Sequence, residues 1–254
     1  MRIAYLDCFS GISGDMLLAA LVDAGANRER IEAELRKLSL GEFRLEWKNV
    51  VKTGVRALKL DVIDETPQPA KPLKALKVIG DHAHHHRGYK EIVEMIEAAG
   101  LAPRVTARAL AVFEKIAAAE AKIHSVPVET VHFHEVGALD SIVDVVGIAL
   151  GLEELGIDRL YAGHVPTGNG YVRCDHGLYP VPAPATMEIL IGIPLRSTNI
   201  QKELTTPTGA GVAAALVHEF GPLPSMTVEA IGYGAGTRDL PDQPNVLRLL
   251  VGHL

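Results

Sequence analysis

The chain has 254 residues, of which 48% are hydrophobic, and its formal net charge is −6. This length and apolar content exclude global disorder and predict one large domain or two small ones, while the negative balance disfavours nucleic-acid binding. Two cysteines give no disulfide framework, the N-terminus lacks a signal-peptide pattern, and no apolar run approaches the roughly 20 residues of a membrane span, so we expect a cytoplasmic protein.

Hydrophobic patterning in the first quarter predicts an α/β fold, a mixed sheet with flanking helices. The predicted elements are a buried strand at 2–7, a glycine-rich turn and helix at 8–25, a second helix at 28–38 and a hairpin at 43–64. The hairpin is expected to turn at Thr53 and Gly54. Antiparallel strands therefore join the sheet.

The chain divides by composition into residues 1–64, 65–87 and 88–254. The middle segment has prolines, lysines and four histidines, which predicts an inserted mobile histidine-rich loop. We expect the last segment to form one globular unit with the first. Its predicted elements are helices at 89–100 and 103–124, alternating strands and helices from 131, and strands at 226–236 and 244–254. Residues 167–186 are too rich in glycine and proline for regular structure over most of their length.

The stretch "VHFHEVGALDSIVD" at 131–144 concentrates metal ligands and proton carriers. A strand at 130–134 would place His132 and His134 on one face, where two imidazoles can chelate zinc or nickel. A helix at 139–155 would place Asp140 and Asp144 on one face near its N-terminus. Because that helix is apolar nearly all round, Asp144 would be a buried carboxylate in need of a partner. The alternatives are that Asp140 is a cap, that Asp144 accepts from backbone amides, and that the histidines line a pocket wall.

Two glycine-containing turns are candidate anion sites. In "SGISGD", the residues Ser10, Gly11, Ser13 and Gly14 let backbone N–H groups approach an anion at a helix N-terminus. Asp7 and Asp15 flank this turn and suggest a hydrated magnesium ion, although Asp15 alone would also favour the helix dipole. In "ELTTPTGAG", Thr206 is the expected N-cap before Pro207, and Thr208 and Gly209 complete a second phosphate site or a simple cap.

Two further groups are candidate metal ligands. Cys174 and His176 are soft and borderline donors, with a packed loop around a buried thiol as the alternative. The histidines of the inserted loop, His82, His84, His85 and His86, suit capture of a late first-row divalent ion. A solvated loop that is rich in histidine is the alternative for them.

These motifs, with "DCFSGISGDM", "RGYKEI", "GYVRCDHGLYPVPAPAT" and "GYGAGTRD", resemble the LarC-type nickel-insertion family through essentially the whole chain. The resemblance implies a nickel chelatase of the lyase class. It would insert Ni²⁺ into pyridinium-3,5-bisthiocarboxylic acid mononucleotide and form the nickel-pincer nucleotide of lactate racemase-type enzymes. The family couples this to hydrolysis of CTP with Mg²⁺ or Mn²⁺, and CTP binding is attributed to a C-terminal domain that this chain lacks. We therefore expect the CTP site outside this chain, in a C-terminal domain that is either a separate chain or the rest of a longer protein of which this is a fragment, and we expect a homo-oligomer.

Residue chemistry suggests roles that the resemblance does not assign. Nickel insertion expels a ring proton, so a base is required, and we assign it to Glu135, with Asp140 and Asp144 as further catalytic carboxylates. His132 and His134 would present nickel, and the phosphate would lie at either glycine-containing turn. Two other functions stay open: a non-catalytic nickel carrier, and a metal-dependent amidohydrolase barrel, which the absence of eightfold strand–helix alternation disfavours.

Overall fold

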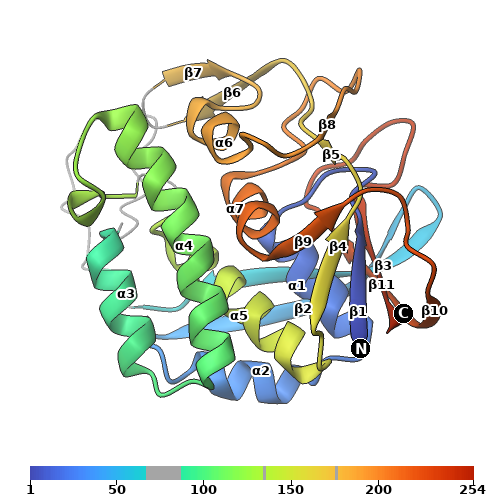
Figure 1. Cartoon of the computed structure of the whole chain (residues 1–254), viewed down its shortest axis with the longest axis horizontal. Coiled ribbons are helices and arrows are strands. Elements are labelled where there is room, and N and C mark those ends of the chain that lie inside the picture. Colours follow the sequence, from blue (N-terminus) through green and yellow to red (C-terminus); the bar gives the residue numbers. More distant parts are fainter. Residues whose placement is uncertain (67–86, 134–135, 175–176) are drawn as a thin grey trace, which may run out of the picture.

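The computed structural model describes residues 1–66, 87–133, 136–174 and 177–254 (Figure 1). The strands are β1 (Arg2–Asp7), β2 (Phe43–Lys52), β3 (Val55–Asp64), β4 (Arg159–Ala162), β5 (Val165–Pro166), β6 (Tyr171–Cys174), β7 (Gly177–Pro180), β8 (Leu195–Arg196), β9 (Val217–Phe220), β10 (Thr227–Ala235) and β11 (Val246–His253). The helices are α1 (Gly14–Asp23), α2 (Arg28–Leu35), α3 (Tyr89–Ala98), α4 (Pro103–His124), α5 (Leu139–Glu154), α6 (Pro184–Ile189) and α7 (Pro207–Leu216), with a 3₁₀ turn, η1, at Val128–Thr130. None of the helices in these ranges is long and apolar enough to cross a membrane.

Seven strands form one mixed sheet in the order β2-β3-β10-β11-β1-β4-β9. β1 pairs in parallel with β4 and antiparallel with β11, and the hairpin β2–β3 joins through a parallel contact between β3 and β10. The predicted mixed α/β sheet is therefore confirmed. Because the described strands form an open sheet with antiparallel pairs, the parallel barrel of the amidohydrolase alternative is wrong for this part of the chain.

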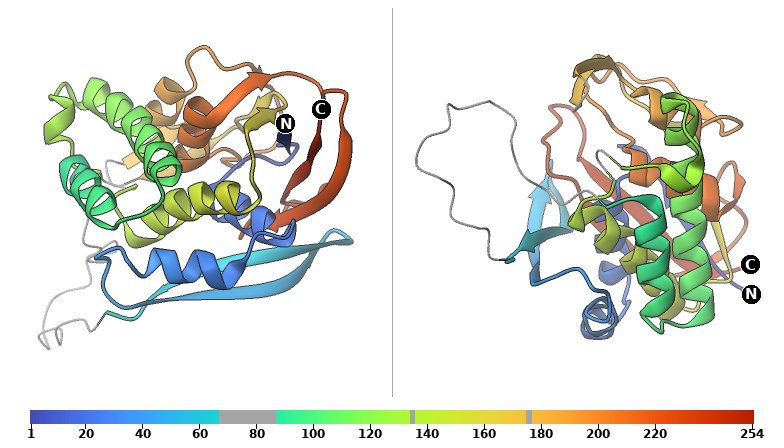
Figure 2. Two further views of the ribbon diagram at one scale, coloured as in Figure 1. Left: turned by 60° about the horizontal axis from the view of Figure 1, so that its bottom comes forward. Right: turned by 90° about the vertical axis from the view of Figure 1, so that its left-hand side faces the viewer.

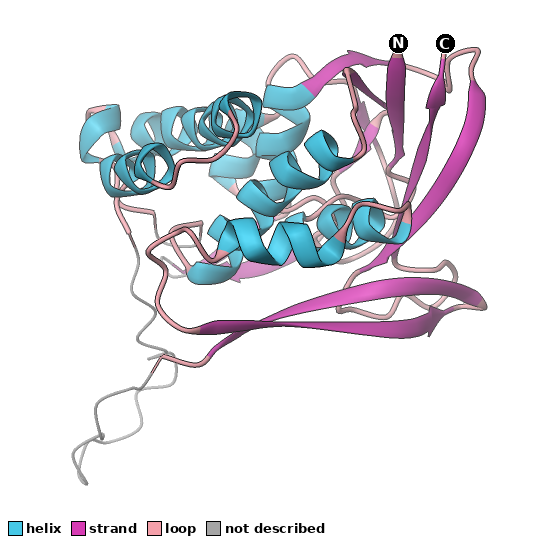
Figure 3. Cartoon of the chain, turned by 90° about the horizontal axis from the view of Figure 1, so that it is seen from below, coloured by secondary structure: helices cyan, strands magenta, loops and turns pink. Residues whose placement is uncertain are grey.

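The helices gather on one side of this sheet (Figures 2 and 3). Alternation along β1 sends Ala4 and Leu6 into the main core under the helices, while Ile3 and Tyr5 face the other side. Helix α1 packs directly on β10, where Gly232 and Gly234 leave room for its backbone. A Cβ atom on Gly234 would lie 1.7 Å from the carbonyl oxygen of Met16, so glycine is required for this close approach. The N-terminal end of α1 is thereby fixed at the carboxyl end of β1.

The local predictions agree with most of the described elements. The β2–β3 hairpin turns at Thr53 and Gly54, which both have positive φ, 45° and 82°. The helices expected at 16–25, 28–38, 89–100, 103–124 and 139–155 and the two final strands are all present.

Two predictions of local structure are wrong. Residues 167–186 contain the β6–β7 hairpin and the start of α6. The prolines are tolerated because they lie from the end of β7 to the start of α6, and Gly170 and Gly177 provide the positive-φ positions. Residues 130–133 form no strand: His132 makes only an isolated bridge with Gly88, although burial still alternates from Val131 to Phe133. The inserted loop expected at 65–87 lies almost wholly outside the described residues.

Candidate functional site

Three helix N-termini meet at a cavity of about 540 Å³ beside the middle of β3. The N-termini of α1, α5 and α7 contribute Ser13, Gly14, Asp15, Asp140, Ser141, Asp144, Thr206, Pro207 and Thr208, and β3 contributes residues 59–63. Val136, Glu203 and Thr237 complete the lining. The partial positive charges of helix N-termini favour anions, whereas the many carboxylates favour cations. The cavity therefore suits a ligand that carries both kinds of charge.

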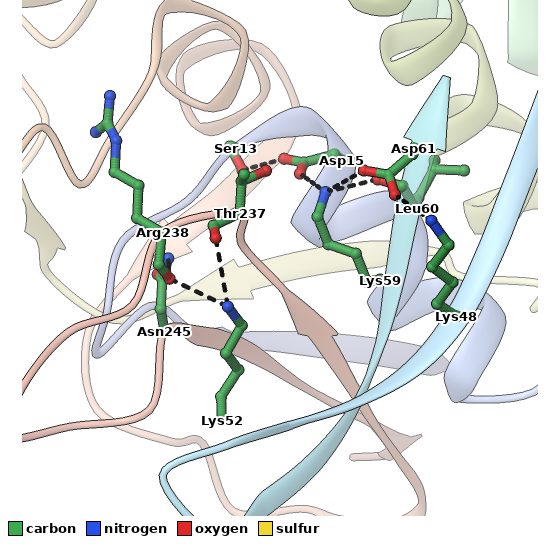
Figure 4. A network of polar contacts seen from close by, with 10 residues as sticks. All are labelled: Ser13, Asp15, Lys48, Lys52, Lys59, Leu60, Asp61, Thr237, Arg238 and Asn245. Atoms are coloured by element: carbon green, nitrogen blue, oxygen red, sulfur yellow. Dashed lines mark hydrogen bonds and ion pairs between the residues drawn. The ribbon is translucent and has the colours of Figure 1, made fainter. Parts of the chain in front are cut away.

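The α1 side of the cavity is a saturated ion-pair network (Figure 4). The Ser13 hydroxyl donates to Asp15 Oδ1, and Lys59 Nζ donates to Asp15 Oδ2 at 3.1 Å. Lys59 Nζ also lies 3.1 Å from Asp61 Oδ1 and donates to the Leu60 carbonyl at 2.7 Å, so all three ammonium protons have acceptors. Lys59 is therefore not available for a ligand without breaking an existing contact, while each oxygen of Asp15 already accepts one hydrogen bond.

The buried Lys59 stays charged because its neighbours compensate. Burial by itself would lower the pKa of Lys59, but Asp15 and Asp61 outweigh this effect and the pKa is raised. Burial would raise the pKa of Asp61, yet Lys59 and Lys48 lower it. Lys59 and Asp61 are therefore both ionised at neutral pH.

The α5 side presents a carboxyl group of the opposite character. Asp144 is 8% exposed, and within the described part of the chain its Oδ1 atom has no hydrogen-bond partner. Burial, and then the charges of Asp15 and Asp140, raise the pKa of Asp144 well above its usual range, although the backbone N–H of Asp15 hydrogen-bonds to it. A Cβ atom on Gly14 would lie 2.5 Å from Asp144 Oδ2, so glycine is required there for Asp144 to approach α1. The sequence therefore correctly predicts a buried carboxylate at Asp144.

Asp140 lies at the rim of the cavity. Its side chain is exposed and accepts from the Ser141 backbone N–H at 2.8 Å. The N-cap of α5 is Ala138, so the alternative in which Asp140 caps the helix is wrong. Asp140 and Asp144 both line the cavity, as their four-residue spacing predicts.

Four of the predicted anion-site residues line the cavity, namely Ser13, Gly14, Thr206 and Thr208, and three do not. The predicted cap is confirmed: the Thr206 hydroxyl accepts from the Gly209 N–H at 3.3 Å. Gly209 and Gly11 instead allow another segment of the backbone to come close. A Cβ atom on Gly209 would lie 2.1 Å from the Ile12 carbonyl oxygen, and one on Gly11 would lie 1.9 Å from the Leu204 carbonyl oxygen. Ser10 is buried and donates to the Pro244 carbonyl at 2.6 Å.

Asp7 and Asp15 do not form the expected magnesium pair. Asp7 accepts from Arg248 Nε at 3.0 Å and does not line the cavity, and both oxygens of Asp15 are engaged. Among the residues with described placement, no three His, Cys, Asp or Glu side chains gather as a metal site.

His132 lies apart from this cavity. It is exposed and lines a separate depression of about 280 Å³ with Glu91, Glu94 and Glu129. Backbone contacts there join the end of the histidine-rich segment to the "VHFHEVG" stretch: Tyr89 donates to the Val131 carbonyl at 2.9 Å and Arg87 to the Gly137 carbonyl at 3.3 Å. His84, His85, His86, His134, Glu135, His176 and the side chain of Cys174 lie outside the described residues.

Sequence reasoning missed Lys59, which holds the α1 side together. The signal was present as period-two alternation in β3, where Lys59 and Asp61 share one face and Leu58 and Leu60 the other. On a hairpin, such a polar face is ordinarily solvated. The burial of Lys59 comes from α1 and α5, which only the tertiary structure places there.

The comparisons with known proteins decide the family. The model of the family described as "Nickel insertion protein" matches residues 4–253. The chain belongs to the nickel insertion protein family. Three curated relatives are all named pyridinium-3,5-bisthiocarboxylic acid mononucleotide nickel insertion protein. One from Geobacillus kaustophilus is 56% identical over 99% of this chain and 60% of its own length. One from Staphylococcus epidermidis (strain ATCC 12228) is 50% identical over 98% of this chain and 59% of its own length. One from Desulfitobacterium hafniense (strain DCB-2) is 46% identical over 100% of this chain and 59% of its own length.

The chain thus spans about 60% of the length of the curated nickel insertion proteins that it matches. No solved structure matches it. The resemblance found in the sequence motifs is confirmed by these matches.

Proposed function

We propose that the chain binds pyridinium-3,5-bisthiocarboxylic acid mononucleotide in the cavity at the three helix N-termini and inserts Ni²⁺ into its ring. The observation that carries this proposal is Asp144, a buried carboxyl group in a cavity of mixed charge, one oxygen of which has no hydrogen-bond partner among the described residues. The curated relatives are named for this substrate and this metal. The mononucleotide combines a cationic ring with anionic groups, which fits the mixture of carboxylates and helix N-termini.

Asp144 is our proposed proton acceptor among the described residues. Insertion forms a bond from nickel to a ring carbon and breaks that carbon's C–H bond, so the proton must move to a base. The environment that raises the pKa of Asp144 makes its carboxylate a stronger base once deprotonated. Asp140 is less suited because it is exposed and already accepts a hydrogen bond from Ser141. Glu135 stays a candidate for the same role, outside the described residues.

The histidines are our proposed route for nickel, which is the substrate metal of this reaction. Neutral imidazole is a suitable ligand for nickel. His132 is exposed and bridges to Gly88, which follows the histidine-rich segment in the sequence. We propose that His84, His85, His86, His132 and His134 capture nickel and hand it to the cavity, with Cys174 and His176 as further ligands.

CTP with Mg²⁺ or Mn²⁺ is assigned to a site outside this chain. Among the described residues, no three His, Cys, Asp or Glu side chains gather to hold such an ion, and Asp7 is paired with Arg248. The remaining 40% of the relatives' length is our proposed location for nucleotide hydrolysis, either as a separate chain or as part of the same one. We also propose that the functional assembly is a homo-oligomer.

The test compares Asp144→Asn with Asp140→Asn in the purified chain. Affinity for the mononucleotide is measured by calorimetry, and formation of the nickel-containing product by mass spectrometry with Ni²⁺, CTP and Mg²⁺. We expect both variants to bind the mononucleotide within a few-fold of the parent. Product formation should fall by about 100-fold or more in Asp144→Asn, the usual contribution of a proton-transfer residue, and stay close to the parent in Asp140→Asn.

Three outcomes would contradict the proposal at different points. Normal product formation by Asp144→Asn would remove Asp144 as the base. A parent chain that binds the mononucleotide and makes no product, with or without CTP, would restrict this chain to substrate binding. Nickel binding without any affinity for the mononucleotide would favour the nickel carrier.

A further inference from the structure

A smaller chamber of about 200 Å³ adjoins the cavity beside the loop between β10 and β11. The residues that line both spaces are Ser13, Asp15, Glu203, Thr206 and Thr237. The smaller chamber adds Lys202 and Arg238, which the larger one lacks. The two spaces therefore meet at the N-termini of α1 and α7 and differ in the charges that each contributes.

The two spaces differ in their balance of charge. The larger chamber adds the carboxyl groups of Asp61, Asp140 and Asp144 to the shared Asp15 and Glu203, against one lysine that is fully engaged. In the smaller chamber, Lys202 and Arg238 balance the two shared acids, and the described lining adds no further carboxylate. A dianionic group would be repelled by the excess of carboxyl groups in the first space, whereas the second offers it two cations.

Arg238 is held in place by contacts to its backbone and its side chain. Its carbonyl oxygen accepts from Asn245 Nδ2 at 2.8 Å and from Lys52 Nζ at 3.3 Å, as the lower left of Figure 4 shows. Lys52 also lies 2.6 Å from Asp239 Oδ1. One guanidinium nitrogen, Nη1, donates to the Glu203 carbonyl at 2.8 Å. The Arg238 backbone is thus anchored, while its side chain is exposed and has N–H donors left over for an anion.

Thr206 supplies a neutral donor at the same chamber. Its hydroxyl oxygen accepts the capping hydrogen bond from the Gly209 N–H, so its own proton can point toward a ligand. The N-terminus of α7 adds a partial positive charge behind it. Lys202 is exposed at the rim and adds a second full charge.

We propose that the smaller chamber is the subsite for the phosphate monoester of the mononucleotide and that Arg238 is its main binding residue. Phosphate in this chamber directs the pyridinium ring into the larger one, where Asp144 lies. The orientation of the substrate is thus set by the difference in charge balance between two joined spaces. This inference rests on the proposed function, because it assumes that the mononucleotide binds in this cavity.

The experiment measures two ligands against four proteins by calorimetry. The ligands are the mononucleotide and its dephosphorylated nucleoside, and the proteins are the parent, Arg238→Met, Arg238→Lys and Arg159→Met. Arg159 is the matched control because it is exposed and pairs with the β1 residue Ile3, at the opposite end of β1 from the cavity. Melting curves verify that every variant is folded.

We expect the parent to bind the mononucleotide more tightly than the nucleoside. Arg238→Met should lose about 10- to 100-fold in affinity for the mononucleotide, the usual worth of a charged hydrogen bond, and keep the parent's affinity for the nucleoside. Arg238→Lys should lose less, because it keeps the charge and loses the planar fork. Arg159→Met should match the parent with both ligands.

Other results would overturn the subsite in ways that separate it from the proposed function. If the parent binds both ligands equally, or Arg238→Met binds the mononucleotide like the parent, the phosphate lies elsewhere while the proposed function stands. If Arg238→Met weakens both ligands equally, Arg238 has only a structural role and the subsite is wrong. If the parent binds neither ligand, the proposed function fails and the subsite fails with it.

Discussion

The α1 and α5 sides of the cavity hold neighbouring carboxyl groups in opposite states. Asp15 on α1 accepts hydrogen bonds on both oxygens and is paired with a buried ammonium group. Asp144 on α5 has an oxygen without a partner in the described structure and a raised pKa. A saturated buried charge stabilises the fold, whereas an unsatisfied buried group has a cost that a ligand can remove. This difference indicates that Asp15 and its partners hold the site together, whereas Asp144 is the group that can react with or bind a ligand.

We expect the largest loss of stability from a substitution that breaks the Lys59 ion-pair network on the α1 side. Lys59→Met leaves Asp15 and Asp61 without their shared cation, and we expect the free energy of unfolding to fall by about 3 kcal/mol, as for other buried pairs that lose one partner. Chemical denaturation measures the change. Lys48→Met is the matched control, because Lys48 also pairs with Asp61, at 3.4 Å, but is half exposed. A loss below about 1 kcal/mol from this control is expected; equal losses from both would mean that burial of Lys59 contributes nothing.

The contact between the two sides can be broken at Gly14. In Gly14→Ala the new Cβ atom would meet Asp144 Cβ at 2.6 Å, so α1 and α5 must separate. Overpacking of this kind costs about 1–3 kcal/mol. Gly221→Ala is the control, since nothing lies within 4 Å of a Cβ atom there. If Gly14→Ala unfolds at the same denaturant concentration as Gly221→Ala, the two sides are not in close contact.

The unsatisfied side should respond to pH. Because the folded-state pKa of Asp144 is raised, folding retains a proton that the unfolded chain releases above about pH 4, and stability falls as pH rises from there. Asp15, Asp140 and Lys59 are the charged groups that face it. Asp144→Asn cannot ionise and so removes this loss of stability at high pH. Its melting temperature should therefore exceed the parent's by about 2–4 °C at pH 8 and by less at pH 4. A constant difference across this range would show that Asp144 has an ordinary pKa; Asp140→Asn serves as the exposed control.

The smallest change is expected in the chemical reactivity of Cys8, which precedes α1 on the α1 side of the cavity. We expect its thiol to be almost unreactive in the folded protein. Burial raises the pKa of the Cys8 thiol to about 12, and the side chain is 3% exposed. In a Cys174→Ser background, iodoacetamide at pH 8 should modify Cys8 only after denaturant is added, because the thiolate is the reactive species. Mass spectrometry follows the reaction. Rapid modification of the folded protein would show that this side opens in solution.

The local parts of the site were predictable from the sequence for a physical reason. Helix periodicity places Asp140 and Asp144 on one face, and the Thr206–Pro207 pair marks the start of α7, because caps and periodicity depend only on neighbouring residues. The assignments of Gly11 and Gly209 to an anion site did not match the structure. Glycine is required wherever backbones approach closely, and the sequence does not show whether the approaching group is a ligand or another segment of the chain.

The sequence by itself determined the α/β class, most of the elements, the family and the presence of a buried carboxylate on α5. The tertiary structure decided which carboxyl group is neutralised. Lys59 reaches Asp15 only because β3 lies beside α1, whereas Asp144 Oδ1 has no hydrogen-bond partner among the described residues. The same assembly places Arg238 at a chamber next to the carboxylates. Burial and charge compensation depend on groups far apart in the chain, so no local pattern encodes them.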